Sequence, residues 1–127
     1  WRGAYVLDGY ADGDFTFVAT GSEVPLAVRT ADLLRGEGIR ARVVSAPSLD
    51  IFDRQPVDYQ NEILGDRSRI VAMEAGRSSG WYKYVNHDAL IIGIDRFGAS
   101  APLADIEKHF GFTPEAVAEN VRGWLKR

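Results

Sequence analysis

The sequence predicts an α/β domain of three layers, in which helices cover both faces of a mostly parallel sheet of about five strands. Short runs of β-branched and aromatic residues alternate with amphipathic helical patterns, as in β-α-β units. The 127 residues are 46% hydrophobic and 26% charged, which is ordinary for a globular chain long enough to bury a core. We therefore expect residues 1–127 to form one domain.

The predicted strands are short apolar segments that end at glycine, proline or polar residues. The first is expected to be an antiparallel edge strand, and the others to be parallel, because helical segments connect them. In chain order they are Ala4–Leu7, Phe15–Ala19, Ala41–Ser45, Arg69–Met73 and Leu90–Ile94.

The first predicted helix follows the second strand, with Ser22 as its N-cap. Its apolar residues recur at the spacing that makes one buried stripe. They are Val24, Ala27, Val28, Ala31 and Leu34. The stretch Gly36–Gly38 should end this helix, because glycine readily takes the left-handed conformation at a C-cap.

Four more helical segments are expected. One runs near Val57–Leu64, and an aromatic one surrounds Trp81–Val85. Two helices close the chain, and the last begins with Thr113 as N-cap and Pro114 at the first helical position. Its expected buried residues are Val117, Val121, Trp124 and Leu125.

Composition excludes several classes of function. A net charge of −3 and a pI near 5.3 argue against a surface for nucleic acid or an anionic membrane. The longest strongly apolar run, Ala89–Ile94, is too short to span a bilayer. The absence of cysteine excludes disulfides and thiolate chemistry, and we expect a cytoplasmic protein.

Because the first residue is Trp1 and not methionine, we expect a processed product or a piece of a longer polypeptide.

Ligands of open parallel sheets collect at the carboxyl ends of the strands, where helix N-termini point their N–H groups. Small residues stand at these positions, and Gly21, Ser22 and Ser48 are candidates for a small-anion or effector site. The alternative is that these residues only turn the chain and cap helices.

Candidates for catalysis are weak. Glu23 and Glu74 follow predicted strands and could form an acid and base pair. The alternative is that Glu23 stabilises the N-terminus of its helix and that Glu74 bonds to nearby backbone or to an arginine. His87 and His109 stand far apart, and neither is in a nucleophile-elbow setting. No dinucleotide motif, Walker A loop or zinc-ligand spacing occurs, so we expect no catalytic, cofactor-binding or metal-binding residue in this chain.

Several phrases together resemble the C-terminal domain of transketolases. These short motifs occur in the family's order from about Gly3 to the last helix. Any one motif alone would be weak evidence for the family. The motifs are Ala19–Val24, Arg42–Ser45 followed by Pro47-Ser48 and Phe52-Asp53, Glu74–Gly76, Trp81–Val85, Phe97–Pro102 and Phe110–Thr113. Small departures, such as Ala46 for a common methionine and Asn86 for a common glycine, look like packing or turn variation.

The resemblance implies a thiamine-diphosphate enzyme that moves a two-carbon ketol unit between sugar phosphates and works as a homodimer in the cytoplasm. In that family the first two domains hold the cofactor and its divalent metal (magnesium or calcium), and the Gly-Asp-Gly signature that binds the diphosphate does not occur here. The resemblance therefore implies a third, structural domain that packs on the remaining transketolase domains in cis, supports the dimer and is inactive by itself.

The expected packing surface consists of exposed apolar groups in two segments. Its candidates are Trp81, Tyr82, Tyr84, Phe97 and Pro102.

Three hypotheses stay open: this scaffold domain, a ligand-binding module at the carboxyl edge, and a self-contained enzyme that uses Glu23 or Glu74. The equivalent domain of related thiamine enzymes, such as the β subunits of 2-oxo-acid dehydrogenases and deoxyxylulose-phosphate synthase, is a further alternative. The Trp81–Tyr84 and Phe97–Pro102 phrases favour transketolase.

Overall fold

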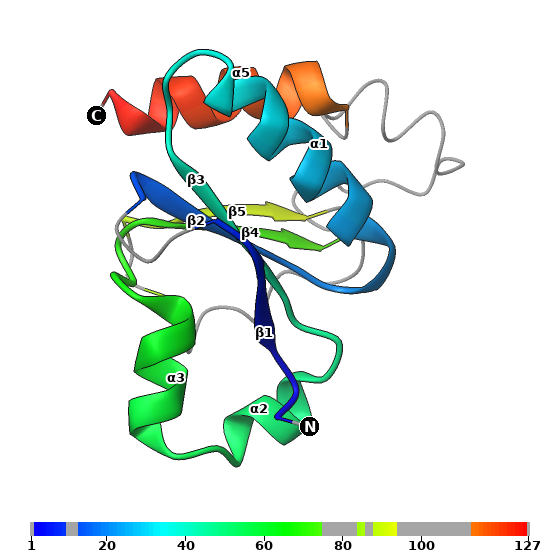
Figure 1. The fold of residues 1–127 in the computed structure, drawn as a ribbon, viewed down its shortest axis with the longest axis vertical. Helices are drawn as coiled ribbons and strands as arrows, with labels where there is room; N and C mark the ends of the chain where they lie inside the picture. Colours follow the sequence, from blue (N-terminus) through cyan, green and yellow to red (C-terminus); the bar gives the residue numbers. More distant parts are fainter. Residues whose placement is uncertain (1, 10–12, 75–83, 86–87, 94–112, 127) are drawn as a thin grey trace.

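A computed structural model describes residues 2–9, 13–74, 84–85, 88–93 and 113–126. They form a five-stranded mixed sheet in the order β1-β3-β2-β4-β5, with helices on both faces (Figure 1). The strands are β1 (Tyr5–Asp8), β2 (Phe15–Ala19), β3 (Ala41–Ser45), β4 (Ile70–Glu74) and β5 (Leu90–Gly93). The predicted fold class is confirmed, and each strand lies within a residue or so of its expected bounds.

Pairing within the sheet matches the prediction. β2 pairs in parallel with β3 and β4, and β4 pairs in parallel with β5. β1 is the antiparallel edge strand beside β3, with an irregular register between Val6 and Asp8. Because Ala19 lies opposite both Ser45 and Met73, the carboxyl ends of the central strands meet at one edge.

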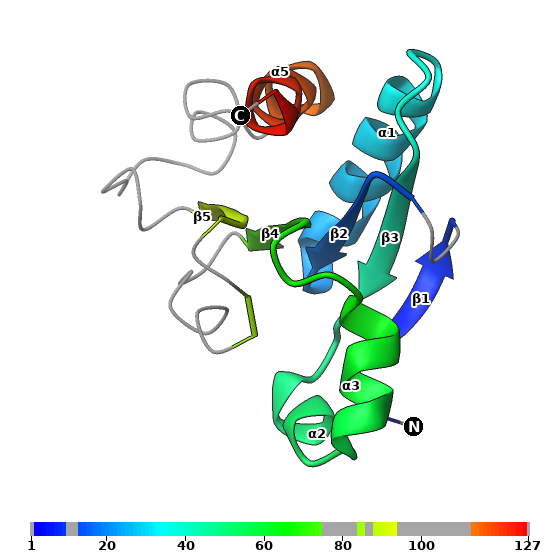
Figure 2. The same ribbon diagram turned by 90° about the vertical axis from the view of Figure 1, so that its left-hand side faces the viewer.

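One face of the sheet is covered by α1 (Val24–Arg35) and α5 (Pro114–Leu125) (Figures 1 and 2). Phe15 sits between the layers and makes edge-on ring contacts with Phe17 and with Trp124 of α5. A bidentate ion pair joins α5 to the turn after α1, because the Arg122 guanidinium donates to both carboxylate oxygens of Glu37 at 2.6 Å.

The other face is covered by α2 (Leu49–Asp53) and α3 (Val57–Leu64), seen below the sheet in Figure 1. α2 is a short helix that the sequence analysis did not predict, whereas α3 has its predicted bounds. The buried side chains of this layer are Ala4, Val18, Val44, Ala46, Phe52, Ile63, Leu64, Ile70, Ala72, Tyr84 and Ile91.

Two details of the predicted helices are corrected. Ser22 is not the N-cap of α1, because Gly21–Glu23 form a turn of 3-10 helix and Glu23 occupies the cap position without a side-chain cap bond. Tyr84 and Val85 lie in a turn and a bend, so the expected aromatic helix does not include them. The rest of that helix and the first closing helix lie outside the described residues.

The ends of α1 and α5 follow the predicted chemistry. After α1, Gly38 has a φ of +85°, and the Ile39 N–H donates to the Leu34 carbonyl, which is the bond expected of a left-handed C-cap. At the start of α5, the Thr113 hydroxyl accepts from the Ala116 N–H at 3.2 Å. No helix among the described residues is long and apolar enough to cross a membrane.

Candidate functional site

The carboxyl edge of the sheet is the first place to look for a ligand. Gly21 lies two residues after the end of β2, and a side chain placed there would meet no atom within 4 Å. The Ser48 hydroxyl caps α2 by accepting from the Ile51 N–H at 3.3 Å. Ser22 lies in the turn after β2, so all three candidates follow strand ends at this edge. Ser48 has a structural role in capping, and an anion site here stays a prediction.

The next candidates are Glu23 and Glu74, which the sequence analysis considered as an acid and base pair. Glu23 is buried at 8% exposure in the turn before α1, and Glu74 ends the neighbouring strand β4. Both backbones thus reach the same edge of the sheet. His87 and His109 lie outside the described residues. The described residues hold no group of three or more metal-ligating side chains, and no bound group is assigned to this chain.

Tyr84 is the one proposed interface residue that the structure describes. It is 2% exposed, and its hydroxyl donates to Asp53 Oδ1 at 3.0 Å. Burial, together with the nearby Asp53 carboxylate, raises the pKa of Tyr84 to about 12. The ring of Tyr84 therefore packs inside this domain, against Phe52 of α2. Trp81, Tyr82, Phe97 and Pro102 lie outside the described residues, so their role stays a prediction.

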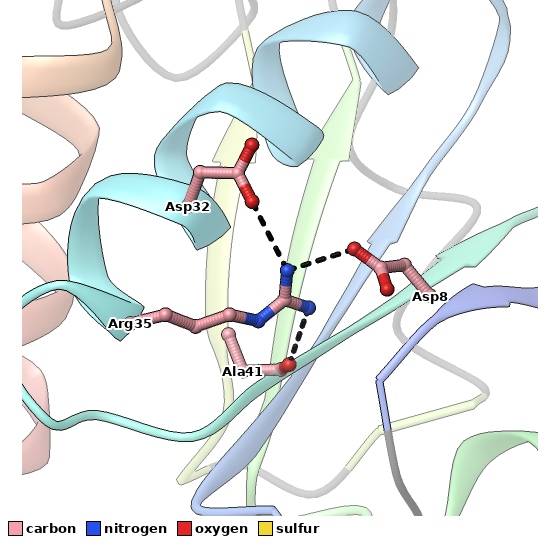
Figure 3. A network of polar contacts seen from close by, with 4 residues as sticks. All are labelled: Asp8, Asp32, Arg35 and Ala41. Carbon is pink, nitrogen blue, oxygen red and sulfur yellow. Dashed lines mark hydrogen bonds and ion pairs between the residues drawn. The ribbon is translucent and has the colours of Figure 1, made fainter.

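At the opposite edge, Arg35 joins α1 to the edge strand β1 and to its neighbour β3 (Figure 3). Its guanidinium bonds to Asp8 Oδ2 at 2.7 Å, to Asp32 Oδ1 at 3.2 Å and to the Ala41 carbonyl at 2.8 Å. The planar guanidinium of Arg35, with its several N–H donors, thus connects the end of β1, the start of β3 and helix α1. We read this network as a structural clamp, because its charges are paired within the domain.

Arg42 is the polar residue that the sequence analysis missed. It lies in the middle of β3 and is only 3% exposed. Its Nε donates to Thr16 Oγ1 at 3.2 Å and its Nη2 donates to the Ile63 carbonyl at 2.7 Å. Burial lowers the pKa of Arg42. The available signal was a single charged residue within a strand that is buried along its whole length.

Fold and site together define a compact mixed-sheet α/β domain whose described polar contacts are mostly structural. The sequence of residues 3–113 matches the family model described as "Transketolase-like TK C-terminal domain". The chain belongs to this family.

Known proteins of the family cover nearly the whole chain. A probable transketolase from Streptococcus pneumoniae is 49% identical over 123 residues, which are 95% of this chain and 19% of that protein. The crystal structure of a transketolase mutant from Pichia stipitis superimposes with a TM-score of 0.85 at 41% identity, covering 98% of this chain and 18% of the other. A structure titled "Split gene transketolase, inactive beta4 tetramer" has a TM-score of 0.70 at 30% identity, covering 99% of this chain and 43% of that chain. The chain thus spans less than a fifth of the first two proteins.

Proposed function

We propose that this chain is the non-catalytic C-terminal domain of a transketolase, and that it supports the assembly of the catalytic domains. The observation that carries the proposal is the match of residues 3–113 to a C-terminal-domain family, together with the 19% share of the curated relative that the chain spans. In such an enzyme the cofactor carries the difficult carbanion chemistry, and the protein must supply its binding site.

The described residues support a structural role. The polar contacts of Arg35, Arg42 and Tyr84 join one element of the domain to another. Thiamine diphosphate and a divalent metal would be held by the rest of the enzyme, because the Gly-Asp-Gly signature does not occur in this sequence. The partners in this proposal are the remaining transketolase domains of the same chain and a second subunit. One similar structure is named "Split gene transketolase, inactive beta4 tetramer", and this name is consistent with a piece of a transketolase that is not active.

The test is ketol transfer from xylulose 5-phosphate to ribose 5-phosphate, with thiamine diphosphate and magnesium supplied. Three samples are compared: this chain, the polypeptide encoded upstream of it, and their mixture. We expect no turnover by this chain alone and a gain in activity on mixing relative to the upstream polypeptide. Turnover by the purified 127-residue chain would contradict the proposal.

A further inference from the structure

A surface hollow of about 350 Å³ lies between the edge strand β1 and helix α3. We call it the β1–α3 groove. The side chains that matter below are Tyr5 and Val6 of β1, Tyr59, Glu62 and Ile63 of α3, and Arg42 of β3. Tyr5 and Val6 are 42% and 38% exposed and both line the hollow, so part of its lining is exposed apolar surface of β1.

The groove contains the buried guanidinium of Arg42, and the Glu62 carboxylate that lines the same hollow does not form an ion pair with it. Both side-chain hydrogen bonds of Arg42 go to neutral oxygens, those of Thr16 and Ile63. Among the described residues no acidic side chain forms an ion pair with it. The Ile63 carbonyl belongs to the last turn of α3, so the negative end of the helix dipole offsets part of the charge. A buried guanidinium without a full counter-charge carries an unbalanced cost of desolvation, which an arriving acidic group would reduce.

The first described residues of the chain lie on the rim of this groove. The Arg2 guanidinium sits 4.5 Å from the centre of the Tyr59 ring. The Tyr59 hydroxyl donates to the Ala4 carbonyl at 2.8 Å, and the Ser48 N–H donates to the Gly3 carbonyl at 3.0 Å. The N-terminal segment is therefore tied to α2 and α3, as its place beside α2 in Figure 1 shows. Any polypeptide that runs into Arg2 is delivered to the rim of the groove.

We propose that the β1–α3 groove is the docking surface for the part of the transketolase chain that precedes this domain, through a segment with an acidic side chain. The inference rests on the proposed function. Two features select this occupant: the place at which a preceding segment arrives, and the unbalanced charge of Arg42. Docking there covers Tyr5 and Val6 and brings a carboxylate toward the guanidinium.

The test measures the affinity of this chain for the polypeptide encoded upstream, with two matched variants of the edge strand. Val6→Glu places a negative charge in the groove. Leu7→Glu makes the same change one residue along, where the side chain is 44% exposed and does not line the groove. Both Val6 and Leu7 border a second hollow on the Arg35 side, so the two variants differ in the groove alone. We expect Val6→Glu to weaken binding about ten-fold or more, and Leu7→Glu less than about three-fold. Circular dichroism of each variant confirms that the fold is intact.

A third variant tests the charge of the occupant. Glu62→Gln removes the acidic side chain of the groove, so an acidic segment should bind about three-fold tighter or more. Unchanged or weaker binding by Glu62→Gln would contradict the proposal that the docking segment carries an acidic side chain.

Several other outcomes would contradict the proposed docking surface. Equal effects of Val6→Glu and Leu7→Glu, or none from Val6→Glu while the polypeptides still bind, would place the interface elsewhere and leave the proposed function standing. Self-association of this chain that Val6→Glu abolishes would assign the groove to a second copy. Failure of the two wild-type polypeptides to bind at all would remove both proposals.

Discussion

The guanidinium of Arg42 donates from Nη2 to the carbonyl of Ile63 at 2.7 Å, which fastens the middle of strand β3 to the end of helix α3. The close approach extends to the next turn, because a side chain on Gly65 would lie 3.1 Å from the same nitrogen. A buried charge in a strand thus serves as the cap of a helix that lies 21 residues away in the sequence.

The first prediction concerns this contact. Arg42→Met should lower the free energy of unfolding by about 1–3 kcal/mol, because the Ile63 carbonyl and the Thr16 hydroxyl lose their donor in a buried setting. Urea unfolding measures it, and Arg29→Met, at an exposed position of α1, is the control with an expected change within about 0.5 kcal/mol. A value for Arg42→Met as small as the control would show that the desolvation cost of the charge cancels its bonds.

A second prediction concerns Tyr84 at alkaline pH. Burial and the Asp53 carboxylate raise its pKa from 10.0 to about 12, so the folded state favours the protonated phenol. This contribution to stability is fully present below pH 10 and is lost as pH rises from 10 toward 12.

Tyr84→Phe removes this alkaline loss. It should also cost about 1 kcal/mol at neutral pH, since the hydrogen bond to Asp53 disappears. Unfolding free energies measured from pH 8 to 12 test both effects, and Asp53→Asn should move the alkaline loss to lower pH. An identical alkaline slope in wild type and Tyr84→Phe would be inconsistent with this account.

The third prediction concerns the ion pair between Glu37 and Arg122 at acid pH. The hydrogen bonds from Arg122 lower the pKa of Glu37 below its ordinary value of 4.5. Its contribution to stability is therefore present above pH 4.5 and is lost as pH falls through the lowered pKa.

Glu37→Gln should reduce the loss of stability on acidification, and Arg122→Gln should do the same, because each removes the same pair. Denaturant unfolding at stepped pH values from 7 to 2.5 provides the comparison, roughly spanning the carboxylate range. Two variants with different acid slopes would show that the two side chains act separately.

The fourth prediction compares two glycines with the same backbone angle. Gly3 has a φ of +86° and Gly38 of +85°, but a Cβ on Gly3 would clash with the Ser48 carbonyl oxygen, whereas a Cβ on Gly38 would meet no atom within 4 Å. Gly38→Ala should cost about 1 kcal/mol for the left-handed conformation alone. Gly3→Ala should cost about 2 kcal/mol more, since backbone atoms must move. Thermal unfolding of both variants measures the difference, and equal costs would show that the N-terminal segment is not held tightly on α2.

Much of the fold could be predicted from residue patterns. The apolar runs at Phe15–Ala19 and Ala41–Ser45 are buried along their whole length, so they are recognisable without alternation. Thr113 and Pro114 marked the start of α5 because their chemistry is local.

What could not be predicted depends on contacts between distant residues. α2 is five residues long and is held by packing of Phe52 against Tyr84, so its sequence carries little periodic signal. The cap of α1 was misplaced by one residue because a 3-10 turn precedes it. The role of Arg42 depends on the arrival of α3 at β3, which no local pattern shows.

The central claim is that this chain supports the assembly of a larger transketolase. It is tested most directly by sedimentation of the upstream polypeptide over a range of concentrations, with and without an equimolar amount of this chain. We predict that the two associate one to one, and that the dimer of the upstream polypeptide then persists to lower concentration. A sedimentation profile equal to the sum of two non-interacting species at every concentration would contradict the claim.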